Sequence, residues 1–299
     1  MKKISIALSF ILLLQCSCGA KKMATKVIGA VSTDGMVAIE SEQDVDFARE
    51  SLPSLIKTLE VLRYGDIRDL RTLVLLSKAY GTYTFGFIEE DLLVLPQGSA
   101  MHIQARERAE LFYRRGKEFG IAALLTKSGM HDAFKAPFPE FKKAIDGLGK
   151  KYVPALFWTA FNWANWMNLN RDDPAAVVNA PKVVAMAERV LELDPDYYYG
   201  SAHALRGLMA ATRPKMLGGD PELANKELRK AMETAPDYLM TKVLYAQYYA
   251  RQTNDKPLFR EELTQVMNAN AGALQEQRLA NELAQRRAKI LMKQEDDLF

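Results

Sequence analysis

The sequence predicts an all-α fold, and two observations carry this prediction. From about Asp44 onward, nearly every apolar segment repeats at intervals of three and four residues, as in helices that bury one face. Four of these segments also share one spacing of small or apolar positions, with steps of 4, 3 and 5 residues. Alternation typical of strands is absent apart from the ambiguous stretch 80–87.

The shared spacing is that of the second helix of a tetratricopeptide repeat. In such a helix a small residue admits the neighbouring helix, a larger one fills the groove, and a proline ends the helix. The four sets are Leu52, Ile56, Leu59, Tyr64; Val183, Ala187, Val190, Pro195; Ala224, Leu228, Ala231, Pro236; and Phe259, Leu263, Val266, Ala271. The matching first helices show Leu73, Leu76, Ser77, Tyr80; Thr159, Ala160, Trp163; Tyr245, Ala246, Tyr249; and, more weakly, Gly207.

These patterns predict a tetratricopeptide-like helix-pair solenoid with about four helix pairs plus capping helices. Residues 44–299 are expected to form this single domain. The turns within repeats are enlarged at 88–100, 168–181 and 212–220, and an extra short helix is expected at 139–148. Insertions at equivalent places in stacked repeats emerge on one face, which is often the binding or assembly face.

The first residues read as a targeting segment rather than as part of the fold. Lys2 and Lys3 precede an apolar run, 4–14, that is too short to span a bilayer. Because small Ser17 stands before Cys18, the pattern predicts a lipoprotein signal peptide at 1–17 and a lipid on Cys18. Cys16 is the alternative acylated residue, and an ordinary secretory leader is the alternative to both. Residues 18–43, small and polar, are expected to be the lipidated N-terminus and a flexible linker.

The balance of charged residues limits the classes of partner that the chain is expected to bind. The chain has 40 basic and 37 acidic residues, and loss of the leader removes Lys2 and Lys3, so the mature chain is nearly neutral. Such a balance offers no electrostatic case for binding nucleic acid. No later segment has 18 consecutive apolar residues, so the sequence supports membrane attachment through the lipid anchor only. We expect a cell-envelope protein facing the periplasm, with a weak preference for the outer membrane from Gly19 and the leaflet left open.

No pattern in the sequence indicates an active site. His102, His131 and His203 lie far apart and in no metal-binding spacing. Motifs of a nucleophile elbow or a phosphate-binding loop are missing as well. The adjacent Glu89, Glu90 and Asp91 are interpreted as a solvated charge run. The sequence therefore predicts no enzyme activity, no cofactor and no metal.

Aromatic residues are the outstanding feature instead. They gather in two runs, 79–87 and 156–168, both in expected first helices, which line the concave face of a solenoid. An aromatic stripe at helical spacing is usually core, yet asparagines among the tryptophans supply the oriented polar groups of a ligand site. The candidate groove residues are Tyr80, Tyr83, Phe85, Phe87, Trp158, Phe161, Asn162, Trp163, Asn165, Trp166 and His203.

Four stretches make the chain resemble a known family, the TatT lipoproteins that accompany tripartite ATP-independent periplasmic (TRAP) transporters. They are Cys18-Gly-Ala-Lys-Lys-Met-Ala24, AYGTYTFGFIEED at 79–91, ALFWTAFNWANWMNL at 155–169 and LELDPDYYYGSAHALRG at 191–207. The first stretch resembles the family's mature start and favours Cys18, and the last places Gly200 and His203 within a family motif.

The resemblance implies a periplasm-facing lipoprotein that binds the TRAP substrate-binding protein and forms a homotrimer. It also implies a mainly hydrophobic groove for a small apolar or organic-acid ligand, and hence a role in solute uptake. Two other classes stay open. A tetratricopeptide scaffold lipoprotein for envelope or outer-membrane assembly would need no apolar pocket, and a hydrolytic lipoprotein would need a paired-carboxylate or Ser/His site that is not apparent in the sequence.

Overall fold

The computed structural model describes residues 33–212 and 219–299, and within these ranges the chain is helical with no strand. This confirms the predicted all-α class. The predicted signal peptide, Cys16, Cys18 and most of the turn 212–220 lie outside the described residues. The helices are α2 (Val45–Arg63), α3 (Leu70–Tyr83), η1 (Thr84–Ile88), α4 (Glu89–Val94), α5 (Ala100–Leu124), α6 (Met130–Lys135), α7 (Phe138–Asp146), η2 (Lys150–Tyr152), α8 (Val153–Leu169), α9 (Pro174–Val177), α10 (Ala180–Leu193), α11 (Tyr197–Ala211), α12 (Pro221–Thr234), α13 (Met240–Leu244), η4 (Tyr245–Ala250), α14 (Lys256–Asn268), η5 (Ala271–Ala273), η6 (Gln275–Gln277), α15 (Arg278–Lys293) and α16 (Glu295–Leu298).

Local sequence explains where several helices begin. Asp44, Asp69, Asp220 and Asp255 each accept hydrogen bonds from backbone N–H groups in the first turn of the following helix. Such caps satisfy donors that no helical carbonyl can reach. Prolines occupy the first turn of α8, α10, α12 and α14, where a missing N–H costs nothing.

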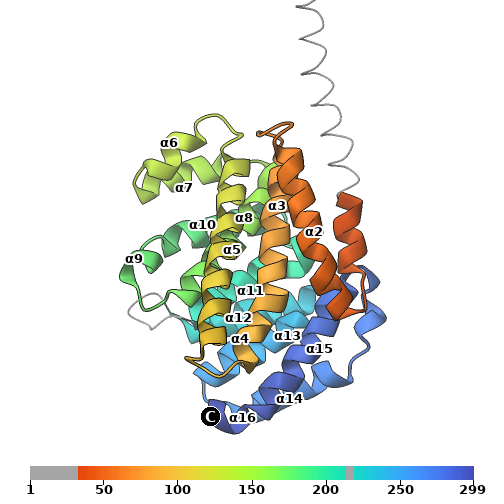
Figure 1. Cartoon of the computed structure of the whole chain (residues 1–299). Helices are drawn as coiled ribbons and strands as arrows, with labels where there is room; N and C mark the ends of the chain where they lie inside the picture. Colours follow the sequence, from red (N-terminus) through yellow and green to blue (C-terminus); the bar gives the residue numbers. More distant parts are fainter. Residues whose placement is uncertain (1–32, 213–218) are drawn as a thin grey trace, which may run out of the picture.

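Helices that follow one another in the sequence also pack side by side (Figure 1). α3 pairs with α5, α8 with α10, α11 with α12, and the continuous α13–η4 with α14. The first members of these pairs contact each other in succession, α3 with α8, α8 with α11, and α11 with α13–η4. This packing order agrees with the predicted helix pairs, while the tetratricopeptide-like solenoid itself stays a prediction.

The residues that define the repeated spacing are core residues. In each of the four sets the first three positions are buried, with exposed fractions of at most 3 %. The fourth positions differ, because Tyr64 is 82 % exposed whereas Ala271 is buried. Gly207, predicted to mark a first helix, lies where α11 crosses α12, and a Cβ there would approach the Leu228 side chain to 2.8 Å. The repeated 4-3-5 spacing thus marks positions that are buried where helices contact each other.

Three helices meet closely at Asn162, which is fully buried in α8. Its side-chain amide donates to the Ser77 carbonyl of α3 at 2.9 Å and to the Trp158 carbonyl at 2.8 Å. The Ser77 hydroxyl in turn donates to the Gly116 carbonyl of α5 at 2.8 Å. A Cβ at Gly116 would lie 2.3 Å from the Asn162 amide oxygen, so glycine is what allows α5 to approach.

The chain closes on itself through α15, which packs against α2 and α4 (Figure 1). Arg287 of α15 donates to Glu89 at 3.0 Å, and Arg286 lies 3.1 Å from Glu90. Glu89 also accepts from the Tyr113 hydroxyl at 2.6 Å. The interpretation of residues 89–91 as a solvated charge run is therefore wrong for both glutamates, which are buried because basic residues about 200 positions away neutralise them.

The N-terminal arm and the turns also carry structure. Residues 33–40 are helical, and Met36 is buried in the core, so the expected flexible linker does not extend through residue 43. The apolar Met36 side chain packs in the core, whereas its small and polar sequence neighbours indicated a linker. The expected short helix at 139–148 is observed as α7, preceded by α6. The enlarged turns 88–100 and 168–181 contain α4 and α9.

Gly116→Ala tests the junction at Asn162. Alanine normally stabilises a helix interior by about 0.5–1 kcal/mol relative to glycine, but here the new methyl group would overlap the buried Asn162 side chain. We expect a net loss of about 1–3 kcal/mol in the free energy of unfolding, measured by denaturant titration. Gly149→Ala is the matched control, since no heavy atom lies within 4 Å of its Cβ position. Equal stability of the two variants would contradict the close approach.

Candidate ligand cavity

An apolar cavity lies where the first helices of the pairs face α15 and η1. The space open to the centre of a water molecule is about 120 Å³, whereas one water needs roughly 10–15 Å³ by this measure. The lining comprises Glu40, Thr82, Phe85, Gly86, Phe157, Trp158, Phe161, Ala164, Asn165, Asn168, Tyr198, Ser201, Ala204, Leu205, Leu208, Met209, Thr212, Tyr238, Met240, Thr241, Leu244, Tyr248, Gln277, Leu279, Ala280 and Leu283. Its size and lining suit a small organic molecule.

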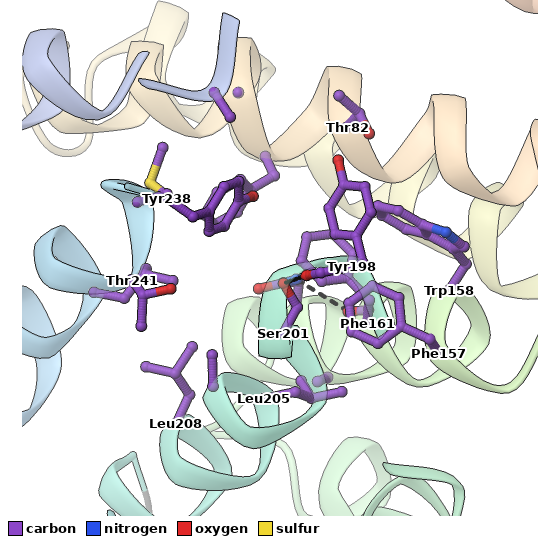
Figure 2. A pocket seen from close by; sticks show the side chains of 18 of the residues that line it. Thr82, Phe157, Trp158, Phe161, Tyr198, Ser201, Leu205, Leu208, Tyr238 and Thr241 are labelled. Carbon is purple, nitrogen blue, oxygen red and sulfur yellow. Dashed lines mark hydrogen bonds between the residues drawn. The ribbon is translucent and has the colours of Figure 1, made fainter. Parts of the chain in front are cut away.

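One stripe of α8 forms the aromatic wall of the cavity. Phe157, Phe161, Ala164 and Asn168 follow at intervals of three and four residues, so they lie on one side of the helix. At a rise of about 1.5 Å per residue this stripe is about 16 Å long. The Trp158 and Tyr198 rings meet edge to face with centroids 5.0 Å apart, and Figure 2 shows both at the side of the cavity opposite Tyr238 and Thr241. The cavity is therefore elongated along α8.

The end of the cavity at Glu40, Tyr198 and Gln277 is called the glutamate end below. Glu40 is 6 % exposed, and its carboxylate accepts from Lys78 Nζ at 2.8 Å and from the Tyr198 hydroxyl at 2.7 Å. The Lys78 ammonium also lies over the Tyr198 ring, 5.0 Å from its centroid. Lysine and glutamate thus neutralise each other, which is what a buried carboxylate requires.

Backbone strain positions Tyr198. Tyr198, Tyr199 and Gly200 all have positive φ, at 46°, 61° and 69°, although they lie within the first turn of α11. Left-handed backbone costs a residue with a side chain roughly 1–2 kcal/mol. The turn is held by Tyr199, whose ring stacks on Tyr238 at 5.2 Å, and by Ser201, whose hydroxyl donates to the Tyr198 carbonyl (Figure 2). The strained turn directs Tyr198 into the cavity.

The tyrosines of the lining stay protonated. Burial raises the pKa of Tyr198 well above its ordinary value, and the nearby Glu40 carboxylate raises it further. Burial likewise raises the pKa of Tyr238 far beyond the physiological range, with Glu40 adding to the effect. Their hydroxyls therefore act as neutral hydrogen-bonding groups and not as proton-transfer groups at neutral pH.

The opposite end of the cavity, at Asn168, Thr212 and Tyr248, is called the arginine end. These residues lie at or near the ends of α8, α11 and η4. Two exposed arginines follow them, Arg171 three residues after Asn168 and Arg251 three residues after Tyr248. The enlarged turns 168–181 and 212–220 begin at this end, since Asn168 and Thr212 are lining residues.

The candidate groove residues separate into two groups. Phe85, Trp158, Phe161 and Asn165 line the cavity. Outside the lining lie Tyr80, Tyr83, Phe87, Asn162, Trp163, Trp166 and His203.

The second group packs elsewhere. Tyr80, Tyr83, Phe87, Asn162 and Trp163 are buried in the core. The remaining two lie between helices: Trp166 lies beneath the Lys117 ammonium, 4.8 Å from its ring centroid, and His203 contacts Glu227 of α12 at 2.6 Å. A groove made of all these residues is thus not what the structure forms.

Sequence reasoning missed most of the C-terminal wall and the whole glutamate end. Glu40 stood in an expected linker, and Lys78 is an ordinary helix residue by pattern. Tyr198 stands among three successive tyrosines, and nothing in the sequence indicated that its backbone is left-handed. Leu205, Leu208 and Leu283 show only the common apolar spacing, which does not tell a core from a cavity wall.

The described ranges hold neither a metal-ligating cluster nor a membrane-spanning helix. No group of three or more His, Cys, Asp or Glu residues there has the arrangement of a metal site. Among the same residues, none of the helices combines the length and the hydropathy needed to cross a membrane.

Comparison with known proteins gives two matches. The family model described as TRAP transporter T-component matches residues 41–299. A protein of Treponema pallidum (strain Nichols), described as uncharacterized, is 23 % identical over 265 residues, which cover 86 % of this chain and 81 % of that protein.

Proposed function

We infer the function of this chain from its family: it belongs to the TRAP transporter T-component family, whose model matches residues 41–299, and it is therefore a transporter component, which we place in the cell envelope. From this premise we propose that it assists solute uptake in two ways. It binds a small apolar or organic-acid ligand in the cavity, and it docks on the periplasmic substrate-binding protein of the TRAP transporter. It acts as a binding protein and not as an enzyme.

The observation that carries the ligand proposal is the lining of the cavity. Aromatic and aliphatic side chains form most of the wall, and of the lining residues that the structure describes, Glu40 is the one that is charged. Because Lys78 already pairs with Glu40, the glutamate end offers no free charge to a ligand. Such a space suits an apolar body, whose transfer from water contributes about 0.8 kcal/mol per methylene group.

Straight-chain alcohols test this proposal. Calorimetric titration of the Cys18→Ser protein with 1-hexanol, 1-heptanol and 1-octanol should show affinity rising about fourfold per methylene group. Ala164→Phe should abolish binding while the protein remains folded, since Ala164 lines the middle of the aromatic stripe. Ala100→Phe, at an exposed position, is the control and should bind as the parent does. Absent binding, or binding unaffected by Ala164→Phe, would favour the scaffold alternative.

The partner proposal rests on family membership and on the enlarged turn 168–181, which begins at the arginine end. We propose a homotrimer that binds the substrate-binding protein. Sedimentation velocity should give the mass of three copies for the protein alone, and a heavier species after addition of the purified substrate-binding protein. A single-copy mass would contradict the trimer. An unchanged sedimentation coefficient, with and without 1-octanol present, would contradict the docking.

We also propose the lipid tether predicted from the leader, with the protein facing the periplasm. Cys18→Ser in the full chain should move the protein from the membrane fraction to the soluble fraction, because loss of the acyl chains removes most membrane affinity. Cys16→Ser is the control and should stay with the membrane. The reverse outcome would assign the lipid to Cys16.

A further inference from the structure

The connection between α2 and α3, residues 61–71, is called the α2–α3 tip below, and it carries exposed apolar side chains. Val61, Tyr64 and Ile67 are 69 %, 82 % and 61 % exposed. Val61 and Tyr64 are three residues apart at the end of α2, so they lie on one side of it, and Ile67 follows in the turn that leads to α3. A single exposed apolar residue is ordinary, whereas three in one short connection indicate a contact surface.

The α2–α3 tip also carries positive charge that is available to an anion. Arg68 and Arg71 are exposed, and so is Lys151, which shares a pocket with Arg71. Among the described residues, none of these three cations lies within ion-pair distance of a carboxylate. The nearest acids along the chain serve the backbone instead, because Asp66 accepts from the Arg68 N–H at 3.1 Å and Asp69 caps α3. These two carboxylates still reduce the net charge, so the tip is only modestly basic.

The N-terminal arm lies beside the α2–α3 tip where its described part begins. Thr33, the first described residue, lines one open pocket together with Asp69 and Arg71 of the tip. From there the arm runs along α2, since a Cβ at Gly35 would lie 3.7 Å from the Leu55 side chain. Cys18, the proposed lipid site, precedes Thr33 by 15 positions, which span at most about 50 Å. The proposed anchor would therefore hold this end of the domain near the membrane surface.

A second group of exposed apolar side chains lies far from the α2–α3 tip. Val94, Met101 and Ile103 are exposed around the turn between α4 and α5. The continuous helical stretch α3–η1–α4 separates this turn from the tip by about 35 Å, and Figure 1 shows the turn toward the other end of α3. Because Thr33 lies beside the tip, a membrane held by the anchor meets the tip and not the α4–α5 turn.

We propose that the α2–α3 tip is a membrane-contacting surface. Tyr64 and Ile67 enter the interfacial region of a phospholipid bilayer, and Arg68 and Arg71 bind lipid phosphate groups. A tyrosine suits this depth because its ring is apolar and its hydroxyl polar, and guanidinium groups match phosphate oxygens in geometry. The domain is thereby oriented on the membrane with this tip toward the lipid.

This inference rests on the proposed lipid tether. Insertion of two or three side chains binds a membrane only weakly, and a single attachment of that kind is reversible. An anchor that ends beside the tip raises the effective concentration of lipid there, so a weak contact becomes the populated one. The anchor supplies the affinity, and the tip supplies the orientation.

The test places a polarity-sensitive fluorophore at the tip. The mature chain with Cys18→Ser contains no cysteine, so Ile67→Cys gives one labelling position. A histidine tag at the N-terminus holds this protein on phosphatidylcholine vesicles through a nickel-chelating lipid, in place of the acyl anchor. The label at position 67 should shift to shorter wavelength on the vesicles, and lipids brominated in their acyl chains should quench it. Met101→Cys, labelled in the same way at an exposed position of α5, is the matched control and should show neither effect.

Two further variants assign the contact to its side chains. Tyr64→Asp should abolish the shift at position 67 while the melting temperature stays near that of the parent, because Tyr64 is exposed. Val94→Asp, at the α4–α5 turn, should leave the shift unchanged. Vesicles of phosphatidylcholine and phosphatidylglycerol in equal parts should enlarge the shift, and Arg68→Gln/Arg71→Gln should remove that enlargement.

The outcomes separate the tip from the tether. A label at position 67 that stays in water on tethered protein would overturn the membrane contact, and so would equal shifts at positions 67 and 101. A shift that phosphatidylglycerol does not enlarge would overturn the phosphate contact of the two arginines. None of these results bears on acylation, because the chelating lipid replaces the acyl chains. The lipid on Cys18 is decided separately by fractionation of the Cys18→Ser chain.

Discussion

The close meeting of α3, α5 and α8 at Asn162 is the constraint on which the cavity depends. A fully buried amide must find partners, because an unpaired polar group in the core costs several kcal/mol. The Asn162 amide nitrogen donates to the Ser77 and Trp158 carbonyls, whereas its oxygen has no hydrogen-bond partner among the described residues, and Gly81 and Gly116 leave the space that the side chain occupies. Rotation of α8 about its axis would break these bonds or drive the side chain into a neighbouring backbone. The same rotation would turn Phe157 and Phe161 away from the cavity.

Closure of the helix array gives the cavity its remaining wall. Leu279 and Leu283 of α15 line it, and one helical turn beyond Leu283 lies Arg287, bonded to Glu89 of α4. Replacing such a buried ion pair by apolar residues is often neutral in free energy, whereas breaking it is costly. The Arg287–Glu89 pair therefore contributes mainly by fixing the position of α15 against α4. Glu40 and the α15 residues Leu279 and Leu283 line the same cavity because α15 packs against α2 and α4.

Sequence periodicity predicted the helices and their contact register well, since burial of one face is what the period records. It could not separate Tyr80, a core residue, from Trp158, a cavity residue, because both environments are apolar. Nor could it place Glu89, whose partner lies about 200 residues away. The left-handed turn at Tyr198 was equally hidden, because tertiary contacts with Glu40 and Tyr238 hold a conformation that local preference disfavours.

The strained turn and the arginine end fit a single arrangement under the proposed function. The strained residues Tyr198 and Tyr199 lie at the glutamate end. Glu40 is already paired there with Lys78, so this end offers a ligand no free charge. Exposed residues occur at the other end, where Asn168 lines the cavity and the turn 168–181 begins. Under the proposed function, a ligand that enters at this end would pass the turn 168–181 first. A docking partner that contacts this turn would meet the ligand where it enters, so the proposed ligand transfer and partner binding would occur at the same end of the cavity.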